Sequence, residues 1–113
     1  MASKAKRRER VVRGSTNVFA DLGYPDADER QTKLRLAHAI NATIGAQRLA
    51  QLPAARRLGV SQPKISALAN YQLDGFSVER LMTFLTALDQ DVDIVIRRKP
   101  RSRSAARISV IAA

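Results

Sequence analysis

The stretch of residues 51–70 constrains the fold most, because two short amphipathic segments are separated there by a single glycine, Gly59. Glycine is the residue that most readily adopts the left-handed backbone of a tight turn. Ala55 is small at the position where two adjoining helices would approach most closely. The pattern predicts two helices that meet at a steep angle across a very short turn, the helix-turn-helix arrangement. Five further residues can supply the apolar contacts around this turn: Ala54, Leu58, Val60, Ile65 and Leu68.

One further helix is predicted on each side of this unit. An acidic first turn at residues 26–29 suits a helix N-terminus, and Gly45 is placed to end that helix. Its buried stripe is expected to contain Leu36, Ala37, Ile40 and Ile44. Ser77 is expected to cap the last helix, whose buried stripe contains Val78, Leu81, Met82, Leu85 and Leu88.

Residues 92–96 are rich in β-branched side chains and predict a short strand with Val92, Ile94 and Ile96 on one face. A strand needs a partner, and the sequence leaves three open: the same strand of a second protomer, residues 11–19, or residues 107–111. The expected fold class is all-α, a helix-turn-helix bundle of four to five helices with a short C-terminal β-strand and basic flexible tails.

Positive charge is concentrated at the two ends of the chain. The sequence contains 20 Lys and Arg against 10 Asp and Glu, and residues 1–13 and 97–113 together hold 12 of these bases and one acid. We expect a basic disordered tail at residues 1–13, a folded domain at residues 14–98 and a basic tail at residues 99–113. The excess of positive charge makes a polyanion, and nucleic acid first, the expected partner.

The residues that the sequence lacks disfavour several classes of function. It contains no Cys and one His, His38, which leaves little for thiol chemistry or a metal site. Asp89, Asp91 and Asp93 alternate, but the glycine and the distal glutamate of a calcium loop are missing. No apolar segment is long enough to cross a membrane. We therefore expect a cytoplasmic protein that is not an enzyme, with no catalytic residue, metal or cofactor.

The second helix of the helix-turn-helix unit is the expected DNA-reading element. Its outward residues are Gln62, Lys64 and Ser66. A glutamine can offer a donor and an acceptor to an adenine edge, and a lysine can donate to guanine O6 and N7. Ser61 at the cap and Gln51 at the start of the preceding helix suit phosphate oxygens. The alternative is that Gln62, Lys64 and Ser66 only form a solvated helix face, and their place within the helix-turn-helix motif disfavours it.

Three segments carry a resemblance to a known family: GSTNVFADLG at residues 14–23, VSQPKISAL at residues 60–68 and GFSVERL at residues 75–81. Over residues 14–98 the chain resembles a subgroup of the XRE family of bacterial regulators and is similar to HigA-type antitoxins. The resemblance implies a lambda-repressor-like, dimeric DNA-binding domain that represses its own operon and neutralises a RelE/HigB-like ribonuclease toxin. Departures from the family stand at Ala50, where a capping Thr or Ser is common, and at Pro53, where Glu is frequent. Carried over by position, the operator-contacting residues are Ser61, Gln62, Lys64 and Ser66.

If a toxin is bound, residues 17–29 are its expected site, because this acidic stretch suits a basic ribonuclease. Three other functions remain open: a stand-alone XRE-type regulator without a toxin, a low-specificity nucleic-acid-binding protein that acts through its basic tails, and a protein-interaction module that no longer contacts DNA. The aromatic content of 4% disfavours the second, because it provides no stacking platform for single strands. The presence of Gln62 and Lys64 disfavours the third. The apolar residues of the acidic stretch, which could equally cover the first helix, are Val18, Phe19, Leu22 and Tyr24.

A homodimer is expected for two reasons. A helical core of about sixty residues is only marginally stable alone. One short recognition helix also reads too few base pairs to define a site in a genome. Double-stranded operator DNA with two inverted half-sites about 34 Å apart is the matching target.

Overall fold

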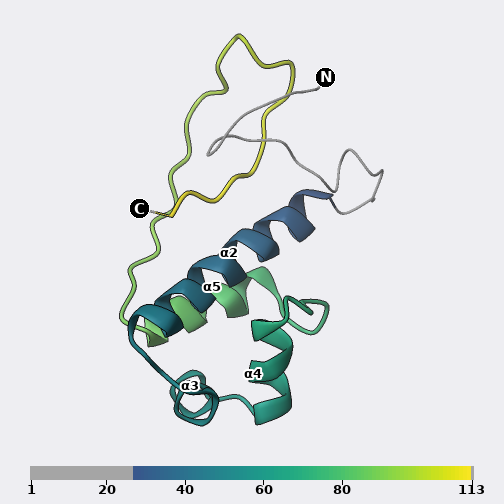
Figure 1. Cartoon of the computed structure of the whole chain (residues 1–113). Helices are drawn as coiled ribbons and strands as arrows, with labels where there is room; N and C mark the ends of the chain where they lie inside the picture. The colour runs from purple at the N-terminus through teal and green to yellow at the C-terminus, as the bar shows by residue number, and fades with distance from the viewer. Residues whose placement is uncertain (1–26, 113) are drawn as a thin grey trace. The chain divides into compact units, whose positions relative to one another are not determined.

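The computed structural model describes residues 27–112, and the regular elements in this part of the chain are four α-helices (Figure 1). They are α2 (Ala27–Ala46), α3 (Gln51–Leu58), α4 (Gln62–Ala69) and α5 (Val78–Ala87). The chain divides into two compact units, and Thr32–Ile94 with Val110–Ala113 forms the helical one. Of the other unit, the described residues are 27–31 and Val95–Ser109. Within the described chain, no helix has the length and apolar character needed to span a bilayer.

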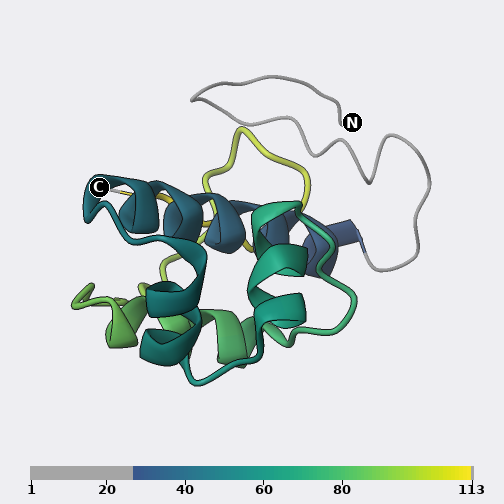
Figure 2. The ribbon, with the colours of Figure 1, turned by 60° about the horizontal axis from the view of Figure 1, so that its bottom comes forward.

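The helices α3 and α4 form the predicted helix-turn-helix unit. Gly59 follows α3 with φ 70° and ψ 34°, the left-handed conformation that the turn requires. The Val60 amide then donates to the Ala55 carbonyl oxygen at 3.0 Å. Ser61 begins the next helix, and its hydroxyl accepts a hydrogen bond from the Lys64 amide at 3.4 Å. Figure 1 shows α3 end-on and α4 from the side, and Figure 2 shows them next to each other, so the two helices cross steeply.

Apolar side chains from all four helices meet in one core. Two hydrogen bonds tie distant elements together around it: Asn41 Nδ2 donates to the Leu68 carbonyl oxygen at 3.1 Å, and Gln47 Nε2 donates to the Leu88 carbonyl oxygen at 2.8 Å. The position of α4 is therefore fixed by a side chain of α2 as well as by packing. All members of the two predicted stripes lie in or against this core: Leu36, Ala37, Ile40, Ile44, Val78, Leu81, Met82, Leu85 and Leu88.

Helix ends are set by local hydrogen bonds. Ser77 caps α5 as predicted, because its hydroxyl accepts a hydrogen bond from the Arg80 amide at 3.0 Å. The end of α2 differs from the prediction, since the helix continues through Gly45, and Arg48 is the residue with a left-handed φ of 57°. The Leu49 amide donates back to the carbonyl oxygen of residue 44 at 3.0 Å, and this closure holds the turn without a glycine.

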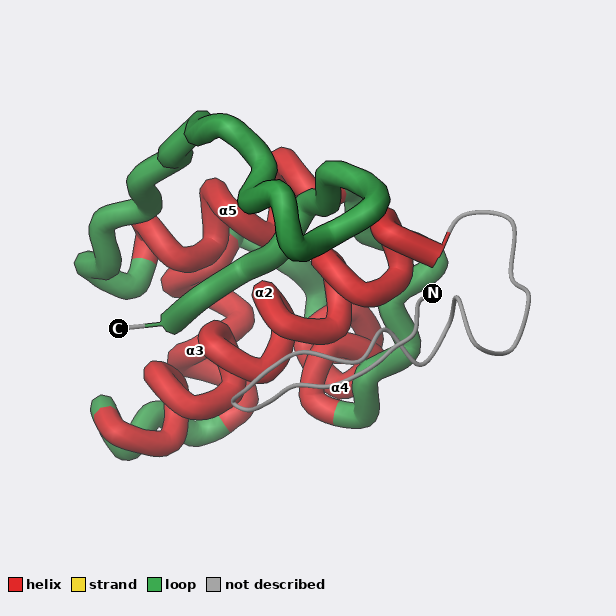
Figure 3. The backbone as a smooth tube through the Cα atoms, turned by 90° about the horizontal axis from the view of Figure 1, so that it is seen from above, coloured by secondary structure: helices red, strands yellow, loops and turns green. Residues whose placement is uncertain are grey.

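The predicted C-terminal strand at residues 92–96 is wrong for the described chain, in which no strand forms (Figure 3). The side chains of Ile94 and Ile96 are 74% and 93% exposed, and only Val92 packs partly against the core. The physical reason is the missing partner, because a ladder needs a second strand and none is supplied within residues 27–112.

The flexible C-terminal tail predicted at residues 99–113 receives no support from the structure. The Arg103 amide donates to the Pro100 carbonyl oxygen at 3.3 Å, and the Lys99 ammonium donates to the Arg103 carbonyl oxygen at 2.6 Å. Val110 then packs against the helical core. The prediction of a tail rested on charge, on Pro100 and on the alternation of serine and arginine, and these signals do not indicate the turn at Pro100 or the packing of Val110. The tail predicted at residues 1–13 lies outside the described residues.

Gly59 and Gly45 provide a matched test of the turn. Gly59→Ala places a side chain on a left-handed residue, and we expect the free energy of unfolding to fall by about 1–2 kcal/mol. Gly45→Ala adds a methyl group to α2 where nothing lies within 4 Å, and we expect an unchanged value or a gain of up to about 1 kcal/mol. Urea denaturation followed by circular dichroism measures both values. Equal changes in the two variants would contradict the role assigned to Gly59.

Candidate nucleic-acid interface

The N-terminal half of α4 presents a polar surface, because its apolar residues face the core. The side chains of Ile65 and Leu68 are 3% and 0% exposed. Gln62 is exposed and Ser66 is half-buried. Pro63 stands in the first turn, where a missing backbone amide leaves no intrahelical acceptor unpaired. The helix therefore offers its first turn to a ligand while its opposite face is held in place.

The starts of α3 and α4 provide backbone amides of the kind that bind phosphate oxygens. At α4 the Ser61 side chain already accepts the Lys64 amide. At α3 the cap residue is Ala50, which has no side chain that could accept a hydrogen bond. Gln51 is exposed at this end of the helix, next to Leu52, which is 52% exposed. Gln51 and Ser61 therefore each stand at the start of a helix.

The Lys64 side chain is engaged with the loop between α4 and α5. Its Nζ donates to the Gly75 carbonyl oxygen at 3.0 Å and lies 4.7 Å from the centroid of the Phe76 ring, a cation–π contact. The Phe76 ring in turn packs edge-on against Phe84, with 5.9 Å between the ring centroids. The ammonium that we expected to meet a base is therefore bound to the protein's own loop in this structure.

Gly75 and Phe76 contribute to this site in a way that the sequence analysis missed. A Cβ atom built on Gly75 would lie 2.7 Å from Lys64 Nζ, so a larger residue would displace the ammonium. The available signal was a glycine and an aromatic residue directly before the cap Ser77. Neither residue type indicates that a lysine 11 residues earlier in the chain would contact this loop.

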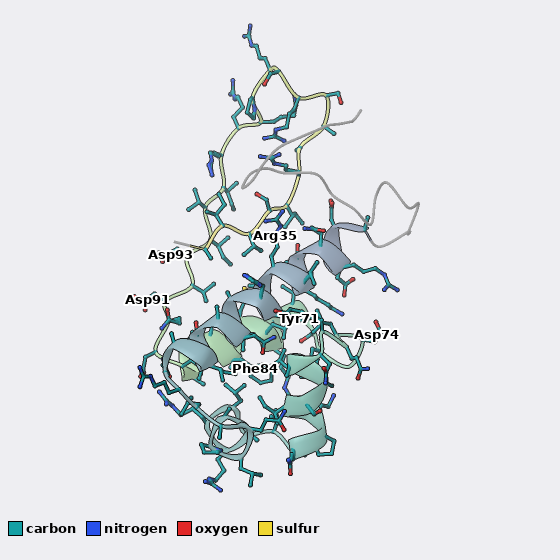
Figure 4. All side chains as sticks on the ribbon, in the orientation of Figure 1. Arg35, Tyr71, Asp74, Phe84, Asp91 and Asp93 are labelled. Carbon is teal, nitrogen blue, oxygen red and sulfur yellow. The ribbon has the colours of Figure 1, made fainter. Side chains whose placement is uncertain are left out.

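Side chains at the C-terminal end of α4 contact the helix itself and α2. Asn70 Nδ2 donates to the Ser66 carbonyl oxygen at 2.9 Å. Tyr71 has a left-handed φ of 59°, and its hydroxyl lies 3.5 Å from His38 Nδ1. Asp74 is exposed on the loop that follows (Figure 4). Because a carboxylate repels phosphate, the tip of this loop is a poor DNA contact, and the N-terminal half of α4 is the better one.

The two arginines at the end of α3 differ in their surroundings. Arg57 Nη2 lies 2.9 Å from Asp89 Oδ2, and the two side chains are 39% and 83% exposed. A pair this exposed stabilises the fold by only about 0–1 kcal/mol, but it neutralises one cation of the helix. Arg56 is exposed at the neighbouring position. Arg56 is therefore the better candidate of the two for a phosphate contact.

The residues expected to bind a toxin cannot be placed in this site. All four lie outside the described residues: Val18, Phe19, Leu22 and Tyr24.

Comparison with known proteins finds similarity to helix-turn-helix proteins. A family model described as a helix-turn-helix domain matches residues 18–97. A solved structure titled as an XRE family transcriptional regulator is 74% identical, with a TM-score of 0.75, and the match covers 79% of this chain and 100% of that chain. No curated protein matches.

Gly75→Ala tests the contact between Lys64 and the loop. The added methyl group would displace the ammonium from the Gly75 carbonyl oxygen and the Phe76 ring, and we expect the free energy of unfolding to fall by about 1 kcal/mol. The Lys64 methylene protons should also lose their ring-current shift in an NMR spectrum. In a Lys64→Met background the same substitution should have little effect, because no ammonium is left to displace. Equal losses in both backgrounds would contradict the contact.

Proposed function

This chain belongs to the helix-turn-helix family of XRE-type DNA-binding transcriptional regulators, and from that premise we propose that it is a sequence-specific repressor of its own operon. The observation that carries the proposal is the placement of α4. Exposed Gln62 stands in its first turn, while Ile65 and Leu68 anchor the opposite face in the core. A helix held in this way can enter the major groove with its polar residues at fixed positions.

Each polar residue of this surface takes a separate part in the proposed complex. Gln62 and Ser66 read base edges, since the amide of Gln62 can both donate to and accept from an adenine. Ser61 and Gln51 contact phosphates from the starts of their helices. Lys64 donates to a guanine, and to do so its ammonium must leave the Gly75 carbonyl oxygen. Operator binding is therefore accompanied by a change in the loop contact.

The proposed repressor acts as a homodimer. A single α4 reaches about three to four base pairs, which is too few for a unique genomic site. Two copies related by a two-fold axis would read an inverted repeat with half-sites about 34 Å apart.

We further propose that the repressor is the antitoxin of a RelE/HigB-like toxin, which its resemblance to HigA-type proteins supports. The acidic stretch at residues 17–29, with Val18, Phe19, Leu22 and Tyr24 in it, is the proposed toxin contact. The alternative is a stand-alone XRE-type regulator that binds the operator through the same surface and has no toxin partner.

Gln62→Ala tests the base-reading surface. Losing a bidentate contact should weaken binding to the protein's own promoter fragment by about 10–100-fold and leave binding to an unrelated duplex unchanged. Lys64→Ala should behave in the same way. Gln90→Ala is the matched control, because Gln90 is also exposed but lies beyond α5. Fluorescence anisotropy at two salt concentrations gives the affinities. Equal losses on both duplexes would reject base reading by these side chains.

Serine substitutions at Arg101, Arg103 and Arg107 separate the repressor from a low-specificity binder. They remove three bases and keep Val110, which packs against the helical core, so they should weaken binding to both duplexes and reduce the salt dependence. We expect the preference for the promoter, about a thousandfold or more in a specific regulator, to survive these substitutions. Equal and steeply salt-dependent binding of the full chain to both duplexes would instead assign DNA binding to the basic ends.

Coexpression with the product of the adjacent gene tests the antitoxin role. The full chain should relieve the growth arrest caused by a toxin, and a Phe19→Asp, Leu22→Asp variant should not, because two new carboxylates would disrupt an apolar contact. Gln62→Ala is the control and should still neutralise the toxin while losing operator binding. If the product of the adjacent gene causes no growth arrest, the proposed antitoxin role is rejected and the proposed repressor role is unaffected.

A further inference from the structure

Residues 95–109 form a basic loop whose two ends are attached to the helical core. Val92 precedes the loop and Val110 follows it, and both side chains pack against that core. Closing a chain at both ends restricts the conformations that it can adopt, so the loop presents its charges in a smaller space than a free tail would. The segment contains six bases and no acid, and the bases are Arg97, Arg98, Lys99, Arg101, Arg103 and Arg107.

A tight turn follows Lys99 in the middle of this loop. The Arg103 amide donates to the Pro100 carbonyl oxygen at 3.3 Å, which is the hydrogen bond of a β-turn. The Lys99 ammonium donates to the carbonyl oxygens of Pro100 and Arg103, at 3.3 Å and 2.6 Å, and so connects the two sides of the turn. Arg101 and Ser102 are the central residues of the turn, and both are exposed. The turn therefore presents Arg101 to the solvent.

The bases of the loop are not neutralised by the protein itself. Among residues 27–112 no ion pair uses any of them, and Figure 4 shows nitrogen-tipped side chains along this segment. Burial, followed by the positive charges of Arg107 and Arg97, lowers the pKa of Arg103. These guanidinium groups repel one another, and a polyanion would offset that repulsion.

The composition and the backbone of the loop select among polyanions. No aromatic residue follows Phe84, so the loop provides no stacking platform for single strands. Residues 95–109 contain no helix, and an α-helix is the element that fills the major groove. The minor groove of B-DNA is about 6 Å wide, which is too narrow for a helix and wide enough for a side chain. The loop therefore suits the minor groove of a DNA duplex.

A·T-rich DNA offers the minor groove that an arginine fits best. Its groove is narrow, and the narrowing strengthens the negative potential that attracts an inserted arginine. The guanidinium group is also more weakly hydrated than an ammonium, so it loses less hydration on entering the groove. Arg101 stands out from the turn and has other arginines on both sides of it along the chain.

We propose that the turn after Lys99 is a second DNA-binding site of this protein and that Arg101 enters the minor groove of A·T-rich duplex DNA. Arg98 and Arg107, which are exposed, contact the phosphates beside the groove. Lys99 and Arg103 hold the turn instead, because their side chains donate to main-chain carbonyl oxygens. The inference adds a contact to the proposed function and does not depend on base reading by α4.

Three duplexes of equal length without promoter sequence distinguish the two grooves. They consist of A·T pairs, G·C pairs and inosine·C pairs. Inosine lacks the 2-amino group that guanine places in the minor groove, and it keeps the major-groove edge of guanine. In fluorescence anisotropy we expect similar affinities for the A·T and inosine duplexes, and an affinity about fivefold or more lower for the G·C duplex. Equal affinities for the inosine and G·C duplexes would overturn the proposal.

Arg101→Lys keeps the charge of the turn and removes the guanidinium group. Because an ammonium is more strongly hydrated, we expect the preference for the inosine duplex over the G·C duplex to fall to about twofold or less, with an unchanged salt dependence. Arg48→Lys is the matched control, because Arg48 is an exposed arginine outside the loop, and it should keep the full preference. Circular dichroism establishes that both variants keep their helices. A full preference in Arg101→Lys would overturn the role of Arg101.

An RNA duplex tests the kind of nucleic acid. The minor groove of A-form RNA is wide and shallow, so it offers Arg101 no narrow groove to enter. An A·U duplex should therefore bind at least about fivefold more weakly than the A·T duplex, and Arg101→Lys should not change its affinity. Equal or tighter binding of the RNA would reject duplex DNA as the ligand of the loop.

The failure of this inference and the failure of the proposed function give different results. Gln62→Ala should lose affinity for the promoter and keep the preference for the inosine duplex, and Arg101→Lys should do the reverse. An inosine preference in a chain without promoter preference would uphold the minor-groove site and reject the repressor. Promoter preference in a chain that binds the inosine and G·C duplexes equally would uphold the repressor and reject the minor-groove site.

Discussion

The close approach of α3 to α4 across Gly59 is the constraint on which the rest of the structure depends. Ala54 and Ala55 are 0% and 4% exposed at this contact, and a larger side chain would force the helices apart. The left-handed turn then sends α4 away from α3 at a steep angle. That angle is what leaves the first turn of α4 outside the core. The packing of α3 against α4 therefore determines which residues of α4 are exposed.

Neighbouring elements determine how firmly α4 is held. Asn41 of α2 binds the Leu68 carbonyl oxygen at one end of the helix, and Lys64 binds the Gly75 carbonyl oxygen nearer the other end. A side chain from α2 and the loop before α5 therefore both restrain this helix. The base-reading role that we propose for this helix requires such restraint, because donors and acceptors must meet base edges at fixed positions.

The sequence was sufficient to predict the elements whose causes are local. The turn follows from one glycine, the caps from Ser61 and Ser77, and the core from apolar residues at helical spacing. The strand at residues 92–96 could not be predicted correctly, because pairing depends on a second segment that is not specified locally. The contact of Lys64 was missed for a similar reason. Its acceptor lies 11 residues further along the chain, and only the path of the loop brings the two together.

The contact of the Lys64 ammonium with its own loop has a consequence for how a regulator finds its site in a genome. Affinity for random DNA comes mainly from cations that are free to meet phosphates. A lysine whose ammonium rests on a carbonyl oxygen and an aromatic ring contributes little to that background. Release of the Lys64 ammonium from the Gly75 carbonyl oxygen and the Phe76 ring would then be favourable only where a guanine is present to accept its hydrogen bonds. The contact of Lys64 with its own loop would therefore lower binding to random DNA more than binding to the operator.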